Sequence, residues 1–298
     1  MRNHRRPIIL AAVGSLATAG LLLPAGPAHA AAPYRVAVTF DSGTVANWLH
    51  VDGTGTAPTA ALTTSGTGNV TRTTWATATI PSYVASVPGV VAGDQKVGVF
   101  PAYAASGNNF AAVKVTPNAF GANDVLAPGT KKLEFGADIK FNSPLPGTRT
   151  ADNGNNVIQR GISTGDQFKI QVDSSAGGTV FNATCLLRDG GTVISEAKVT
   201  TTNIAASNWY RLFCTRTTVG GVDSLTLSVQ DLDAGTPADT DNDAGSALTN
   251  LDFGTASAGT PIPLSMGAKV KNGGNVDDLN SDQFNGRIDN GYVAIDWP

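Results

Sequence analysis

Alternation of apolar and polar residues runs along most of the chain, and it limits the possible folds more than any other feature. The pattern recurs in several separate runs, namely residues 34–40, 133–141, 168–172 and 225–229. Successive side chains of a β-strand point to opposite faces, so this period of two predicts strands with one buried face. Asp189-Gly190-Gly191 is typical of a hairpin turn between strands near 180–187 and 193–199. We therefore expect an all-β fold, an antiparallel two-sheet sandwich of the jelly-roll type.

The acidic residues argue against helices. Of the 23 acidic residues only Glu134 and Glu196 are glutamates, and glutamate is the acid that favours helices. Glycine and proline, 34 and 16 residues, supply many turn positions. Long charged helices and coiled coils are therefore not expected.

The first 30 residues have the organisation of a signal peptide. A basic group is followed by an apolar stretch and by small residues at a cleavage site: Arg2, Arg5 and Arg6, then residues 7–23, then Ala28-His29-Ala30. We expect cleavage after Ala30 and a secreted, extracellular protein whose residues 31–298 form a single domain. The pair Arg5-Arg6 leaves both Sec and twin-arginine export open.

The charge of the mature chain argues against nucleic acid as a partner. Cleavage would remove three of the 20 basic residues and no acidic residue, which changes the formal net charge from −3 to −6. Binding to a duplex requires clustered basic residues, and Lys131-Lys132 is the only adjacent basic pair after residue 30. The mature chain also lacks an apolar run of about 18 residues, so no membrane span is expected in it.

Two cysteines, Cys185 and Cys214, lie in separate strand-like runs. In an exported chain an even number of cysteines predicts a disulfide. A zinc site is the poorer interpretation, because no histidine lies near either cysteine in the sequence.

Six segments of the chain together form a recognisable set: residues 156–161, 167–173, 184–188 and 209–216, then 263–269 and 282–290. The first four resemble consecutive strands, and the last two the closing strands, of secreted actinobacterial laminin-G-like domains of the concanavalin A-like lectin and glucanase superfamily. The resemblance covers residues 131–298 and leaves residues 31–130 as a divergent N-terminal half of the same domain. It implies a two-sheet jelly roll whose first strand, near residues 34–40, pairs with the last.

The residue types of this chain give little support to a catalytic function. Glycoside hydrolysis usually requires a pair of carboxyl groups, and the Glu-Asp-Glu strand typical of the superfamily's glucanases is absent. Jelly-roll polysaccharide lyases combine His with Tyr and Arg, and the mature chain keeps one histidine, His50. Convergence of Tyr, Arg and His50 on one sheet face would favour an enzyme, whereas an aromatic platform would favour a binding protein.

Calcium is the cofactor that the acidic residues suggest, because Ca²⁺ prefers oxygen ligands. The first candidate site is Asp239, Asp241 and Asp243, which we expect on a loop, and the second is Asp277, Asp278 and Asp282. The run at 239–250 is not an EF-hand, because its twelfth position is Asn250 and not Glu. Solvated acidic loops that keep the protein soluble are the alternative interpretation.

Sugar rings stack on aromatic side chains while nearby polar groups bind their hydroxyls. The candidate ligand-binding residues are Trp48, His50, Trp75 and Tyr103, all in the N-terminal half. The sequence thus predicts a secreted non-catalytic binding module for a polysaccharide, a cell-surface glycan or another extracellular ligand. A polysaccharide lyase or glycoside hydrolase on the same fold and a structural or adhesion protein of the envelope are the alternatives.

Overall fold

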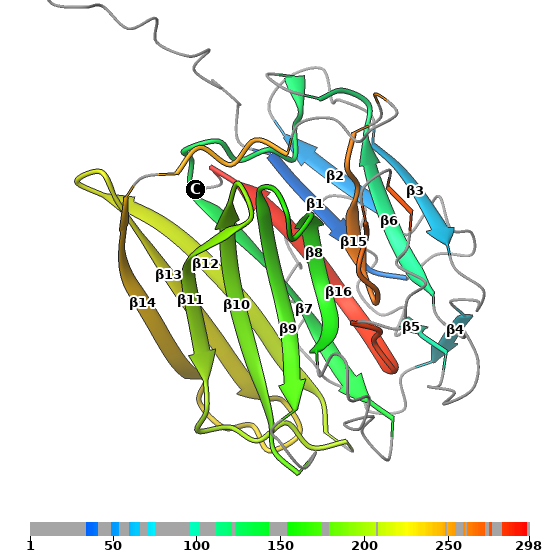
Figure 1. Ribbon diagram of the computed structural model, residues 1–298. Coiled ribbons are helices and arrows are strands. Elements are labelled where there is room, and N and C mark those ends of the chain that lie inside the picture. Colours follow the sequence, from blue (N-terminus) through cyan, green and yellow to red (C-terminus); the bar gives the residue numbers. More distant parts are fainter. Residues whose placement is uncertain are drawn as a thin grey trace, which may run out of the picture.

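The computed structural model describes most of the C-terminal part of the chain and separate strands of the N-terminal part. The described residues are 34–40, 49–53, 60–65, 71–74, 96–101, 111–120, 123–142, 154–174, 179–206, 208–247, 249–253, 259, 261–271, 274–275 and 282–296. They contain sixteen β-strands in two antiparallel sheets and no α-helix (Figure 1). Within these residues no helix is long and apolar enough to cross a membrane. The predicted antiparallel sandwich is confirmed.

The first sheet has nine strands. Seven form a continuous order: β14 (Asp239–Ala247), β13 (Val222–Asp231), β12 (Tyr210–Val219), β7 (Leu133–Phe141), β16 (Gly286–Ile295), β1 (Tyr34–Val38) and β2 (Leu49–Gly53). The other two, β5 (Lys96–Val99) and β4 (Thr71–Thr74), are attached through pairing of β5 with β16. The first strand, β1, pairs with the last, β16, as expected.

The second sheet has seven strands. Their order is β11 (Thr192–Val199), β10 (Phe181–Asp189), β9 (Gln167–Ser174), β8 (Gly154–Gly161), β15 (Leu264–Met266), β6 (Ala112–Pro117) and β3 (Ala60–Ser65). The predicted hairpin turn connects β10 and β11, and Gly190 and Gly191 hold positive φ angles of 53° and 87° there. Glycine adopts such angles without steric cost, which explains this turn sequence.

The core lies between the two sheets and is made from the apolar positions of the alternating runs. Phe135 of the first sheet and Phe168 of the second lie with their ring centroids 4.6 Å apart. The predicted disulfide between Cys185 and Cys214 is confirmed, and it joins β10 in one sheet to β12 in the other. The sheets are thus held together by apolar packing and by one covalent bond.

A buried ion pair joins two separate segments of the chain. The Arg160 guanidinium on β8 pairs with the Asp124 carboxylate, and both side chains are fully buried. The guanidinium also lies 4.7 Å from the centre of the Phe253 ring. Asp124 in turn accepts a hydrogen bond from the backbone N–H of Leu126. The pair therefore anchors the segment before β7 to the second sheet.

Candidate functional site

The outer face of the seven-stranded sheet, the face turned away from the core, carries polar side chains on β9. Phe168, Ile170 and Val172 of this strand belong to the core. Side chains alternate along a strand, so Lys169 and Gln171 lie on the outer face. Lys169 is nevertheless buried, and Gln171 is half-buried.

Strand β8 adds two amides to the same face through a β-bulge. Asn156 lies opposite Gln171, Ile158 lies opposite Ile170, and Gln159 lies opposite Lys169. The register shifts between Asn156 and Ile158, so β8 has one extra residue there. Because of this extra residue, Asn156 and Gln159 share one face although they are three positions apart.

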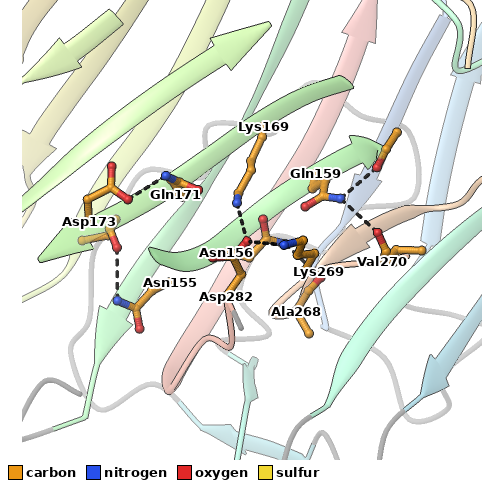
Figure 2. Close-up of polar contacts among 12 residues, drawn as sticks. Asn155, Asn156, Gln159, Lys169, Gln171, Asp173, Ala268, Lys269, Val270 and Asp282 are labelled. Atoms are coloured by element: carbon orange, nitrogen blue, oxygen red, sulfur yellow. Dashed lines mark hydrogen bonds and ion pairs between the residues drawn. The ribbon is translucent and has the colours of Figure 1, made fainter. Parts of the chain in front are cut away.

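Together with residues near the C-terminus, these side chains form what we call the polar cluster. It consists of Asn156, Gln159, Lys169, Gln171, Asp173, Lys269 and Asp282, and Figure 2 shows it on β8, β9 and the neighbouring C-terminal segments. The cluster combines amides, ammonium groups and carboxylates.

An ion pair lies at the centre of the polar cluster. The Nζ atom of Lys169 lies 2.7 Å from Oδ2 of Asp282, and Nζ of Lys269 lies 3.6 Å from the same oxygen. The exposed fractions of these side chains are 8% for Lys169, 4% for Asp282 and 23% for Lys269. The backbone N–H of Asn156 also donates to the carbonyl oxygen of Asp282, at 3.2 Å. Lys269 is therefore the charged group at the centre that solvent reaches most easily.

The two amides of β8 fasten the segment that follows β15. Asn156 Nδ2 donates to the carbonyl oxygen of Ala268 at 2.9 Å, and Gln159 Nε2 donates to those of Gly161 at 2.8 Å and Val270 at 3.4 Å. Both amide side chains are fully buried. Their oxygens, Oδ1 of Asn156 and Oε1 of Gln159, find no donor within the described part of the chain. The cluster thus contains two buried acceptors with unused capacity.

Asp173 lies at the more open end of the polar cluster. Its Oδ1 accepts a hydrogen bond from Gln171 Nε2, and its Oδ2 accepts one from Thr184 Oγ1, both at 2.6 Å. Gln171 and Asp173 are both partly exposed. These two residues therefore form a polar border that solvent reaches next to the buried amides.

A further lysine lies beside the polar cluster. Lys114 on β6 is opposite Ser265 of β15, which in turn is opposite Gln159. Its Nζ donates to the carbonyl oxygen of Gly274 at 3.1 Å. Burial lowers the pKa of Lys114. With this residue, three ammonium groups, those of Lys114, Lys169 and Lys269, and the carboxylates of Asp173 and Asp282 lie in or beside the polar cluster.

Most of the residues predicted for ligand binding, and part of the predicted calcium sites, lie outside the described residues. These are Trp48, Trp75, Tyr103, Asp277 and Asp278. Their predicted roles stay predictions. Asp282 is the one member of the second calcium candidate that is described, and its carboxylate is paired with lysines.

His50 belongs to the other sheet. It lies in β2 opposite Ala37, and Ala37 lies opposite Tyr292 of β16. Ala37 and Tyr292 pack together in a small cluster separate from the main core. On a neighbouring part of this sheet, Arg211 donates to both carboxylate oxygens of Asp138, at 2.8 and 2.9 Å. The fold therefore places His50 in a row with a tyrosine and apart from the polar cluster.

The first predicted calcium site is a strand and not a loop, so that expectation is corrected. Asp239, Asp241 and Asp243 alternate along β14, opposite core residues of β13. Asp241 Oδ2 accepts from the backbone N–H of Lys198 at 2.7 Å, and Asp243 Oδ2 accepts from that of Glu196 at 2.7 Å.

Asp239 Oδ2 accepts in the same way from the hydroxyls of Thr201 and Thr202, the first at 3.2 Å. Asp241 and Asp243 thus bind the edge strand β11 of the other sheet, and they satisfy N–H groups that would otherwise lack a partner strand. Among the described residues no group of three or more His, Cys, Asp or Glu could hold a metal ion. Calcium binding stays a prediction.

Sequence reasoning did not select most of the polar cluster. Lys169 and Gln171 were visible only as polar positions of an alternating run, and Asn156 and Gln159 only as part of a strand-like segment. Their meeting with Lys269 and Asp282 depends on segments more than 100 residues apart. The one local signal was an alternating strand whose outward positions carry a lysine and an amide.

Comparison with known proteins does not identify a family. No family model matches the chain, and no curated protein matches it. Among solved structures, the chain is similar to the LG1-3 region of the laminin alpha2 chain, with 17% sequence identity and a TM-score of 0.40. The match covers 63% of this chain and 30% of that one, so the chain spans less than a third of the length of that structure.

Proposed function

We propose that the protein is a secreted, non-catalytic binding module that holds a polysaccharide, or another hydroxyl-rich extracellular ligand, on the outer face of the seven-stranded sheet. The observation that carries the proposal is the group of partly exposed polar side chains, Gln171, Asp173 and Lys269, which lies beside the buried amides of Asn156 and Gln159.

The energetic argument concerns the cost of unused acceptors. A buried polar atom without a partner costs about 1–3 kcal/mol, and the N–H groups of the same two amides offset part of this cost by holding the segment that follows β15. Two such atoms beside partly exposed polar groups are consistent with a site that a ligand completes. Ordered water at the same oxygens is the competing explanation, and a binding assay separates the two.

Accessible polar groups support the same proposal. Gln171, Asp173 and Lys269 are partly exposed and adjoin the buried amides. An amide, a carboxylate and an ammonium group together can both donate to and accept from the hydroxyls of a sugar. Stacking on Trp48, Trp75 or Tyr103 is the aromatic contribution that we predict.

Secretion is part of the proposal. The disulfide Cys185–Cys214 is compatible with an oxidising compartment, and the first 30 residues have the features of a cleaved leader. Calcium at Asp277, Asp278 and Asp282 is also retained as a proposal, which a chelator tests.

The experiment is retention of purified residues 31–298 on a panel of immobilised neutral and acidic polysaccharides, with and without EDTA, with product release followed in parallel. We expect retention without products, and weaker retention after Gln171→Leu. The control variant is Thr226→Val on β13, which lies in the other sheet. New reducing ends or unsaturated products would show an enzyme, and absence of retention on every polysaccharide would refute the binding function.

A further inference from the structure

We infer that Lys169 and Asp282 join through an isopeptide bond, a covalent modification that links β9 to the segment before β16. The bond forms within the chain and needs no ligand, so the inference is independent of the proposed function. It is carried by the distance between the two groups, by their burial and by the second lysine beside them, Lys269.

Burial distinguishes this pair from the other described ion pairs of lysine with a carboxylate. Nζ of Lys169 lies 2.7 Å from Oδ2 of Asp282, and the two side chains are 8% and 4% exposed. Lys131 and Asp296 form a matched exposed pair, with 3.0 Å between nitrogen and oxygen and side chains that are 36% and 37% exposed. Of the described pairs, Lys169 and Asp282 are thus the amine and the carboxyl group that meet away from water.

The burial of two charges favours their conversion into an amide. Each charged group loses its hydration when it is buried, and the attraction within the pair offsets this loss only in part. An amide carries no net charge, so its formation removes both charges from the interior. Exclusion of water also opposes hydrolysis of the bond once it has formed. Burial, which keeps an external ligand from Lys169, therefore supports condensation.

The fold positions both groups before they react. Lys169 lies on β9, which is paired on both sides, with β8 and with β10. The carbonyl oxygen of Asp282 accepts a hydrogen bond from the backbone N–H of Asn156 at 3.2 Å, and Asp282 has a positive φ of 56°. Groups held in contact in this way reach effective concentrations of about 10⁵ M or more. Such a concentration favours amide formation that free amines and acids do not show in water.

The reaction is a condensation in which no atom comes from outside the chain. A proton passes from Nζ of Lys169 to Oδ2 of Asp282 along their hydrogen bond, which leaves a neutral amine and a neutral carboxyl group. The lone pair of Nζ then attacks Cγ of Asp282, and the C–N bond forms. A second proton moves from the nitrogen to the Oδ2 hydroxyl, the Cγ–Oδ2 bond breaks and one water molecule leaves. The products are an amide and water, without oxidation or reduction.

Lys269 stabilises the negative charge that develops on oxygen during this reaction. Its Nζ lies 3.6 Å from Oδ2 of Asp282, and Figure 2 shows both lysines directed at this carboxylate. A fixed positive charge next to a developing oxyanion lowers the barrier. The amide keeps one side-chain oxygen of Asp282, so the calcium proposed at this residue is compatible with the bond.

The test is the intact mass of folded residues 31–298 after reduction and alkylation of the cysteines. We expect a mass that is lower than the calculated one by one water molecule. Tryptic digestion should give a branched peptide that joins residues 161–188 to residues 272–287. Its fragment spectrum should show Lys169 uncleaved and linked to Asp282.

The controls separate this pair from other lysines and carboxylates. The peptides that contain Lys131 and Asp296 should stay unlinked, because that pair is exposed. Lys169→Arg keeps the positive charge but replaces the nucleophilic amine, so it should have the full calculated mass. Lys198→Arg, at an exposed position on β11, should lose one water molecule as the wild-type chain does. Thermal unfolding of each variant shows that it is folded.

The role of Lys269 is tested by the rate of bond formation. Chains collected unfolded from inclusion bodies, in which the pair cannot meet, are refolded and their mass is followed with time. Lys269→Met should lose water at least tenfold more slowly than the wild-type chain. An unchanged rate would overturn the role of Lys269.

The full calculated mass in the folded wild-type chain would overturn the inference, and so would loss of water that persists in Lys169→Arg. A branched peptide between other residues would overturn the assignment to Lys169 and Asp282. Retention on polysaccharides is measured separately, so failure of this inference is distinguishable from failure of the proposed function.

Discussion

Reduction of the disulfide between Cys185 and Cys214 should lower the free energy of unfolding by about 3.6 kcal/mol. The two cysteines are 29 residues apart in the sequence, and the bond closes this loop in the unfolded chain. In the chain-entropy relation, a loop of this length removes about that much conformational freedom from the unfolded state. Both cysteines are fully buried and lie in different sheets, so the bond also constrains the sandwich directly.

The assay is urea unfolding of residues 31–298, with and without dithiothreitol, followed by tryptophan fluorescence and compared as free energies extrapolated to water. Reduced wild-type chain keeps both sulfur atoms, so the difference reports the covalent constraint and not a cavity. The Cys185→Ala/Cys214→Ala variant is the control, because its unfolding must not respond to the reductant. If oxidised and reduced wild-type chains unfold with the same free energy, the loop-closure reasoning is refuted.

Three further predictions concern buried or partly buried polar groups. Asp124→Leu leaves the buried guanidinium of Arg160 without its carboxylate, and should lower the free energy of unfolding in urea by about 3–5 kcal/mol. Asp124→Leu/Arg160→Met should restore most of the loss, and a double variant no more stable than the single one would contradict this. Burial raises the pKa of Tyr34 from 10.0 to about 12, so the folded chain keeps a proton that the unfolded chain loses. Stability should therefore fall as the pH rises through this range, a dependence that denaturation at several pH values should find reduced in Tyr34→Phe. Asp241→Ala/Asp243→Ala removes acceptors from two backbone N–H groups of β11, and should cost about 1 kcal/mol per carboxylate. Hydrogen exchange at β11 should become faster in that variant, and unchanged exchange would show that these bonds do not protect the edge.

Alternation along the sequence was sufficient to predict which residues of a regular strand face the core. Phe168, Ile170 and Val172 are buried in the core, and Lys169 lies on the opposite face, as the period of two requires. This part of the fold is local, because the direction of a side chain depends on its own backbone.

The β-bulge in β8 marks where that reasoning stops. Regular alternation would place Asn156 and Gln159 on opposite faces, since they are three positions apart. The register shift between Asn156 and Ile158 brings them to the same face. Nothing in the residue types of this segment distinguishes a bulged strand from a regular one, so only the pairing with β9 reveals it.

The aspartates of β14 show how composition misleads. Asp239, Asp241 and Asp243 alternate with other polar residues, so the period of two is present but the segment reads as a turn-rich acidic loop. In the structure their acceptors are used by donors of β11 and of the segment that follows it, from residues about 40 positions earlier. Carboxylates are tolerated on the inner side of an edge strand only because a second edge lies opposite them.

The sequence by itself determined the all-β class and the disulfide, since only two cysteines were present to form one. These are properties of local pattern and residue type, whereas the pairing of the first strand with the last was expected only from the resemblance to a known family. Only the tertiary structure decided which polar groups meet: Lys169 and Asp282 are 113 residues apart, and Asn156 and Ala268 are 112 apart. The physical reason is that such contacts depend on strand order and register across the whole sandwich, which local periodicity does not specify.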